Sequence, residues 1–106
     1  MFARSVSFHL KPGHAAAFTQ LLAKDIIPTL RKQKGFQDEI ALVAPGGGDA
    51  LGISLWDRKE DAETYARSAY PGVLKALEQV VEGTPQVQTY DVANSTFHKI
   101  AAGATV

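Results

Sequence analysis

The segment FARSVSFHLKPGHAAAFTQLLAKDIIPTL, residues 2–30, contains the change of hydrophobic period that decides the fold. Over residues 2–10 apolar side chains alternate with small or polar ones, which is typical of a strand with one buried face. Arg4 is the exception on the apolar face. After Lys11-Pro12-Gly13 the spacing becomes helical, with apolar residues at Phe18, Leu22, Ile26 and Leu30. The segment therefore predicts a strand followed by an amphipathic helix, with a kink in its last turns at Pro28.

The remainder of the chain adds further strands and a second helical region. Gly35 ends the first helix, and Asp57 with Glu60 three residues later has the form of an N-cap with its capping partner, so a second helix is expected to begin near Arg58. The elements after Gly35 are predicted, in order, as strands over 36–43 and 50–56, helical pieces from 58 to 69 and over 73–81, and a last strand over 86–97.

The order strand, helix, strand, strand, helix, strand consists of two β-α-β halves. Units of this order build a four-stranded antiparallel sheet with both helices on one face, the ferredoxin-like α+β architecture. We expect one domain over residues 1–100 and a frayed tail of small residues over 101–106.

A sheet covered by helices on one side leaves its other face bare. If Phe2 and its alternating partners face the helices, the other face is predicted to carry Ala41, Val43, Trp56, Tyr90 and Val92. Apolar patches of this kind mark interfaces. A homodimer that packs two sheets face to face is therefore expected.

The composition excludes several classes of protein. The chain has 106 residues, eleven basic and eleven acidic residues and no cysteine, so disulfide scaffolds, thiolate metal sites and thiol nucleophiles are ruled out. The zero net charge provides no field for nucleic acid or an anionic membrane. No apolar run approaches the ~20 residues of a membrane span, and the N-terminus lacks the pattern of a signal peptide. We expect a cytoplasmic protein with no nucleic-acid or membrane partner.

Three features of the chain resemble the dimeric α+β barrel superfamily, and within it the antibiotic-biosynthesis-monooxygenase-like group. They are the β-α-β-β-α-β order, the passage from Pro28 to Gly35-Phe36, and the strand ending in Trp56 that leads into an acidic helix start with Tyr65 further on. The resemblance covers residues 2–97 and implies a sheet-to-sheet dimer whose ligand cleft lies between sheet and helices. It implies a cofactor-independent oxidoreductase acting on an aromatic or quinol-type small molecule. The alternative is a non-catalytic, small-molecule-binding or stress-related dimer of the same fold.

Three residues are candidates for catalysis. Trp56 falls on the strand-end tryptophan of the group that the chain resembles, where it would line the cleft mouth, or else fill the contact between sheet and helices or the dimer contact. Tyr65 would supply a phenolic donor, or else pack its ring on the sheet with its hydroxyl in water. His9 would serve as a general base near neutral pH if an acid oriented it, and is otherwise a surface or interface histidine.

Haem degradation, a further activity of the superfamily, is not expected. That branch uses an asparagine, a tryptophan and a histidine at the positions that align with Val6, Tyr65 and about Lys75, and all three differ here.

The remaining polar candidates are less specific. The chain's three histidines have no metal-ligand spacing, so no metal site is expected. His14 is expected to be exposed, and His98, after the last strand, is placed to cross to the partner subunit. Asp91 alternates onto the apolar side of its strand, where Arg4 is a candidate partner for an ion pair.

Overall fold

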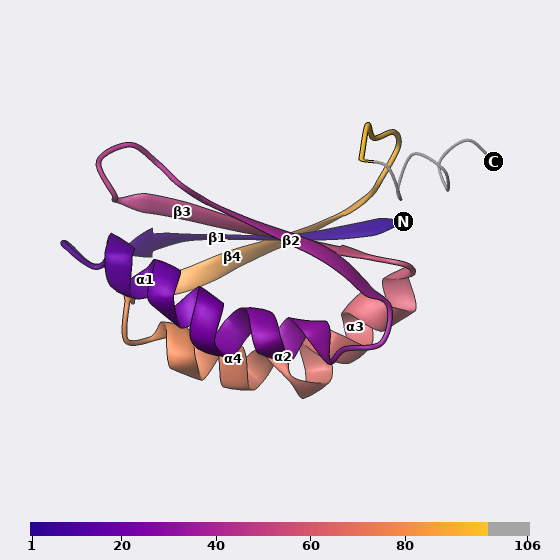
Figure 1. The fold of residues 1–106 in the computed structure, drawn as a ribbon, viewed down its shortest axis with the longest axis horizontal. Coiled ribbons are helices and arrows are strands. Elements are labelled where there is room, and N and C mark those ends of the chain that lie inside the picture. The colour runs from indigo at the N-terminus through magenta and orange to yellow at the C-terminus, as the bar shows by residue number, and fades with distance from the viewer. Residues whose placement is uncertain (98–106) are drawn as a thin grey trace.

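The protein consists of a sheet with helices on one of its faces (Figure 1). The computed structural model describes residues 1–97. The sheet has the order β2-β3-β1-β4, with all neighbours antiparallel. Its strands are β1 (Phe2–Leu10), β2 (Phe36–Val43), β3 (Asp49–Trp56) and β4 (Val81–Asp91). This topology confirms the ferredoxin-like α+β fold predicted from the sequence.

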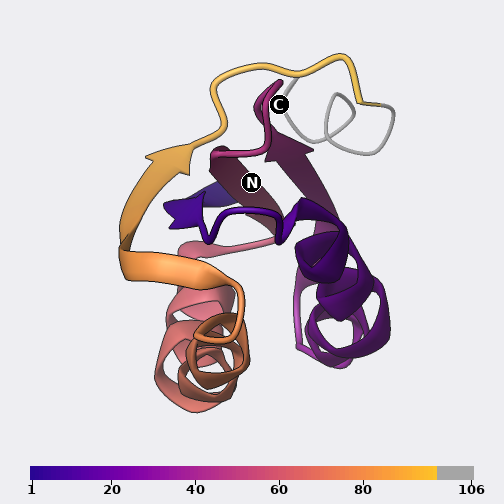
Figure 2. The same cartoon turned by 90° about the vertical axis from the view of Figure 1, so that its left-hand side faces the viewer.

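Two helical segments cover the same face of the sheet and lie side by side when viewed along their axes (Figure 2). The first runs through α1 (Ala15–Leu21), η1 (Leu22–Ile26) and α2 (Ile27–Arg31), and the second through α3 (Lys59–Ser68) and α4 (Tyr70–Leu77). η1 is a π-helical turn, a frequent cause of helix bending. It directly precedes α2, in which Pro28 occupies the first turn. None of the helices within residues 1–97 is long and apolar enough to cross a membrane.

The last strand and the helix before it differ from the prediction. β4 begins at Val81 instead of residue 86, and α4 spans Tyr70–Leu77 instead of 73–81. Residues 83–85 were expected to separate helix from strand. Gly83 instead has a φ of 71°, and the pairing of β4 with β1 shifts register between Ser7 and His9. These residues therefore form an irregularity inside the strand, which is the usual role of a left-handed glycine at a β-bulge.

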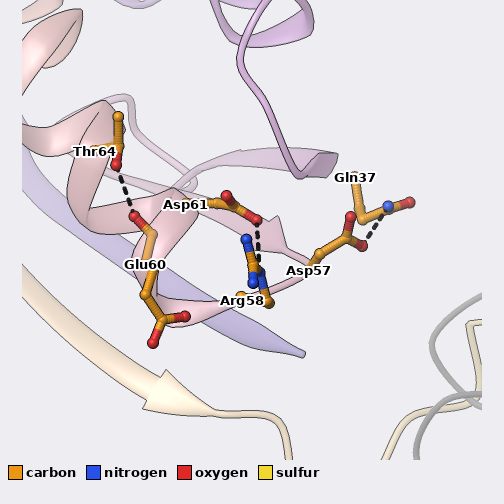
Figure 3. Close-up of polar contacts among 6 residues, drawn as sticks. All are labelled: Gln37, Asp57, Arg58, Glu60, Asp61 and Thr64. Atoms are coloured by element: carbon orange, nitrogen blue, oxygen red, sulfur yellow. Dashed lines mark hydrogen bonds and ion pairs between the residues drawn. The ribbon is translucent and has the colours of Figure 1, made fainter.

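The start of α3 also differs in its capping (Figure 3). The N-cap is Arg58, in an extended conformation, and no side chain caps the helix. Asp57 instead accepts a hydrogen bond of 2.6 Å from the Gln37 side chain. Glu60 accepts, through its backbone carbonyl, a hydrogen bond from Thr64. The predicted pairing of Asp57 with Glu60 as cap and capping partner is wrong, because Asp57 bonds across to β2.

The turn before β2 is locked against α3. Gly35 has a φ of 78°, and its carbonyl accepts a hydrogen bond of 2.8 Å from the backbone of Asp57. A Cβ at this glycine would lie 2.1 Å from an oxygen of the buried Asp61 side chain. Asp61 also pairs with Arg58 at 3.7 Å (Figure 3). The absent side chain of Gly35 therefore lets the first turn of α3 approach the chain that enters β2.

The strand registers show which side chains face the helices. Phe2 on β1 lies opposite Trp56 on β3, and Trp56 has no exposed surface. Ala41 and Val43 on β2 pair with Gly52 and Ala50 of β3, on the same helix-covered side. The prediction that Ala41, Val43 and Trp56 lie on the bare face is therefore wrong.

The helix-free face is apolar nonetheless. Its exposed members include Ile40, Leu42 and Tyr90, with 45%, 46% and 51% of their surface accessible. Beside them Ala3 and Leu55 form a small cluster against which Met1, Ile53 and Val92 pack. The positions predicted for Tyr90 and Val92 are confirmed. The larger apolar residues of β3, Leu51, Ile53 and Leu55, lie on this face, while the small residues Gly52 and Ser54 lie on the side of the helices.

Candidate functional site

A cavity of about 40 Å³ lies between the sheet and the helices. Val6 and Phe8 of β1 form part of its wall, and the helices add mostly apolar side chains such as Phe18 and Leu22. Five lining residues bear polar groups: Arg4, Glu39, Ser54, Tyr65 and Tyr70. The volume suffices for about three water molecules. Apolar walls around a few converging polar groups are typical of sites for small molecules.

Aromatic rings build one side of the site. Trp56 stacks on Tyr65 with a centroid distance of 5.1 Å and an interplanar angle of 30°, and Phe36 makes an edge contact with Trp56 at 5.6 Å. Tyr65 in turn contacts Tyr70 at 5.9 Å. The Trp56 indole donates a hydrogen bond of 2.9 Å to Ser54, whose hydroxyl donates to the Arg4 carbonyl at 3.3 Å. The wall is thus fixed by packing and by hydrogen bonds to β1.

Arg4 brings a buried positive charge to the cavity. Its position on β1 points it toward the helices, and only 5% of its surface is exposed. The guanidinium carbon lies 3.9 Å from the centre of the Tyr70 ring and 5.5 Å from that of Tyr65. Within residues 1–97 no hydrogen bond or ion pair involves this guanidinium, and its nitrogens therefore reach accessible space, since no fully buried side-chain nitrogen there lacks a partner. The ring faces hold the cation, and its N–H donors remain available to a ligand.

Glu39 brings an acidic group to the same cavity. It lies on β2 opposite Ser54, and its Oε1 is 3.0 Å from the point where a Cβ on Gly52 would be. Burial raises the pKa of Glu39 to about 8, although the positive charge of Arg4 acts in the opposite direction. Burial also raises the pKa of the Tyr65 phenol above its ordinary value, again against the effect of Arg4. The site therefore contains a carboxyl group that titrates near neutral pH and a phenol that stays protonated.

The structure brings together two of the three residues predicted to be catalytic. Tyr65 lines the cavity, and Trp56 lies directly behind it without reaching the cavity itself. His9 lies on the other face of the sheet, where it is exposed and contacts the Asp49 carboxylate across β1 and β3.

The other polar candidates lie outside the cavity. The predicted ion pair of Arg4 with Asp91 is wrong. Asp91 on β4 lies opposite Phe2 on β1 and is exposed, whereas the Arg4 guanidinium lies over the Tyr70 ring. His14 bonds to the Pro12 carbonyl at 2.8 Å. His98 and the predicted tail at 101–106 lie outside the described residues. Among the described residues, no group of three or more His, Asp or Glu side chains is placed to hold a metal ion.

Sequence reasoning missed Glu39 and Tyr70. Glu39 alternates with Ala41 and Val43, so it shares a face with apolar residues in the way that Arg4 does on β1. Gly52 and Ser54 on the neighbouring strand were the second signal, because consecutive small side chains on one face leave a space that a larger polar group can enter.

Comparisons with known proteins identify the fold. No family model matches the chain, and no curated protein matches it. Among solved structures it resembles the monooxygenase from the gene ActVA-Orf6 of Streptomyces coelicolor in complex with nanaomycin D, with a TM-score of 0.76, 15% identity and coverage of 91% of this chain and 90% of that one.

Two further structures are similar to a comparable degree. SnoaB, a cofactor-independent oxygenase from Streptomyces nogalater, has a TM-score of 0.73 and 15% identity over 90% of this chain and 95% of that one. NE2512, a protein of unknown function from Nitrosomonas europaea, has a TM-score of 0.74 and 16% identity over 91% and 92%. The resemblance to the antibiotic-biosynthesis-monooxygenase-like group is thereby confirmed at the level of the fold.

Proposed function

We propose that this protein is a monooxygenase-like enzyme that binds an aromatic or quinol-type small molecule in the cavity between sheet and helices, and oxidises it with molecular oxygen without a cofactor. The observation that carries the proposal is the cavity itself, in which the buried Arg4 and the phenols of Tyr65 and Tyr70 meet apolar walls. Two proteins of the same fold support it, because one is a monooxygenase with bound nanaomycin D and another is a cofactor-independent oxygenase.

The chemistry of the lining suits such a reaction. Direct oxygenation requires an electron-rich ring, and hydrogen-bond donors fixed in a dry site stabilise the anionic form of a phenol or enol. Arg4 supplies charged donors and Tyr65 a phenolic one. Trp56 keeps Tyr65 in place through their stacked rings. Because the cavity has room for only a few water molecules, an entering ring has to displace some of the side chains that line it.

The working unit in this proposal is a homodimer. The exposed apolar side chains Ile40, Leu42 and Tyr90 lie on the helix-free face, and a second copy of the sheet would cover them. The cavity lies on the opposite side of the sheet, so each protomer would keep its own site.

Oxygen consumption with a panel of hydroquinones and anthrones tests the catalytic proposal. Wild-type protein is expected to consume oxygen with at least one member of the panel. Tyr65→Phe is expected to lower the rate about a hundredfold, because a donor to the developing oxyanion is lost. Trp56→Phe is expected to have a smaller effect, exerted through the position of Tyr65. Tyr90→Phe is the matched control, since Tyr90 lies on the helix-free face and should leave the rate unchanged. His9→Gln tests separately the sequence-based prediction for that residue.

A non-catalytic binding protein of the same fold is the second candidate. The small volume of the cavity favours it, because a ligand held there would leave little room for oxygen. In that case members of the panel bind, as measured by calorimetry, and no oxygen is consumed by the wild type.

A further inference from the structure

We propose that the cavity holds at most one negative charge: an ionised Glu39 and the deprotonated oxygen of a bound hydroxyarene exclude each other, so a hydroxyarene that enters beside an ionised Glu39 passes its proton to that carboxylate. This inference rests on the proposed function, because it assumes that an aromatic molecule enters the cavity. It goes further by naming the ligand class, an aromatic ring with an acidic hydroxyl, and by making Glu39 the proton acceptor.

The charges of the lining residues limit the cavity to one anion. Arg4 is the one cation among its described lining residues, and the faces of Tyr70 and Tyr65 hold it in place. A buried charge is costly unless an opposite charge compensates it, and one guanidinium compensates one anion. A carboxylate and an aryloxide together in this cavity would leave one negative charge without a partner.

The position of Glu39 suits it to accept the proton of a ligand in the cavity. Its carboxylate reaches into the cavity over Gly52, where a Cβ would lie only 3.0 Å from Oε1 of Glu39. It faces Arg4 from β1, Tyr65 from α3 and Tyr70 from α4. The first helical segment contributes apolar side chains to the cavity. On the outer side, Arg31 of α2 and the neighbouring Asp38 border a surface groove that Glu39 also touches.

The acidity of Glu39 fits this role. The pKa of Glu39, about 8, is much closer to the pKa of a simple phenol than is the pKa of an ordinary carboxyl group. Proton transfer between groups of similar pKa carries only a small free-energy penalty, and the charge of Arg4 reduces it further by stabilising the aryloxide.

The step balances within the cavity. The O–H bond of the hydroxyarene breaks and an O–H bond forms on the Glu39 carboxylate, while the electron pair stays on the aryl oxygen. The aryloxide then replaces the carboxylate as the anion whose charge Arg4 compensates in the cavity, and the total charge is unchanged. No oxidant takes part in this step, and its product is the electron-rich anion that the proposed oxygenation requires.

Binding of para-nitrophenol as a function of pH tests the inference, because this probe is an anion at alkaline pH. Above pH 8 wild-type Glu39 has to take up a proton before the anion can bind, so affinity is expected to fall about tenfold per pH unit, with about one proton taken up per ligand. Glu39→Gln should bind with an affinity independent of pH in that range and without proton uptake. Glu63→Gln, which removes the same charge from an exposed site on α3, should behave as the wild type.

Two further measurements show whether a change in Glu39→Gln comes from the lost carboxylate and not from altered folding. Gly52→Ala places a Cβ 3.0 Å from Oε1 of Glu39 and so disturbs the packing while keeping the ionisable group, and it should retain the pH dependence of the wild type. Para-nitroanisole, the methyl ether of the probe, has no ionisable hydroxyl and should bind to the wild type without proton uptake.

The outcomes separate the two proposals. If the wild type binds para-nitrophenol with an affinity independent of pH above 8, or if Glu39→Gln takes up the same number of protons, the inference is wrong and the proposed function stands. If no hydroxyarene binds at any pH, the proposed function itself is wrong.

Discussion

At the scale of single residues, Glu39 determines how the stability of the protein responds to pH. Its pKa rises from an ordinary value of 4.5 to about 8 on folding, so the folded state holds its proton more tightly than the unfolded state. The free energy of unfolding should therefore fall as the pH rises from 4.5 to 8 and level off above 8. Glu39→Gln removes this fall, and the variant should exceed the wild type in stability by about 1–3 kcal/mol at alkaline pH.

Urea unfolding on both sides of pH 8 measures this difference. Glu63→Gln, in which the same charge is lost at an exposed position, should follow the wild type at every pH. A wild type whose stability rises through the same range would contradict the burial of the Glu39 carboxylate.

Arg4 and Tyr65 were recognisable in the sequence, whereas Glu39 was not. Arg4 interrupts an otherwise regular apolar alternation, and Tyr65 follows helical spacing after an acidic helix start. The face of Glu39 depends on a register shift between Phe36 and Asp38, where Gln37 is an extra residue in β2. An extra residue reverses the alternation of a strand. The alternation of Glu39 with Ala41 and Val43 places these three residues on one face, but nothing local in residues 36–43 marks that face as the one under the helices.

At the scale of elements, the contact between the β2 entry and α3 depends on Gly35. Gly35→Ala would place a Cβ within 2.1 Å of the Asp61 side chain and would force a left-handed φ on alanine. We expect it to lower the free energy of unfolding by about 3 kcal/mol or more. Gly13→Ala is the matched control, because Gly13 has a similar φ of 74° with no atom within 4 Å of the new Cβ.

Thermal or urea unfolding of the two variants separates backbone strain from steric clash. Gly13→Ala should lose only about 1 kcal/mol. Equal losses in both variants would show that Asp61 moves aside without cost, against the tight packing described for α3.

The elements that were predicted well are those in which period and boundary signals agree. The strands over 2–10 and 36–43 have the predicted bounds, since a Pro-Gly pair follows the first and a glycine precedes the second. β4 was misplaced because Gly83 and Pro85, which commonly end elements, lie inside it. Tertiary pairing with β1 outweighs the local tendency of these two residues to break the strand.

At the scale of the whole molecule, the apolar helix-free face predicts self-association. Sedimentation of the wild type should show a dimer at micromolar concentration, and Ile40→Asp should shift it to a monomer, because a charge would be buried without a partner. Ala17→Asp introduces the same charge on the exposed side of α1 and should leave the dimer intact. A wild-type monomer would refute the association.

The fold class followed from the order of the elements alone, while the cavity did not. Its lining comes from three strands and from both helical segments, so it exists only once their registers are fixed. The residues of the bare, helix-free face also depend on the strand registers. Its apolar character was predicted, but three of the five residues assigned to it lie under the helices.

The stacked pair of Trp56 and Tyr65 makes the protein its own optical probe. Trp56 is the one tryptophan of the chain, it has no exposed surface, and it lies directly behind a lining residue of the cavity. All of the indole fluorescence therefore originates from a single ring against the cavity wall. Its emission reports ligand entry and the movement of Tyr65 without any attached label.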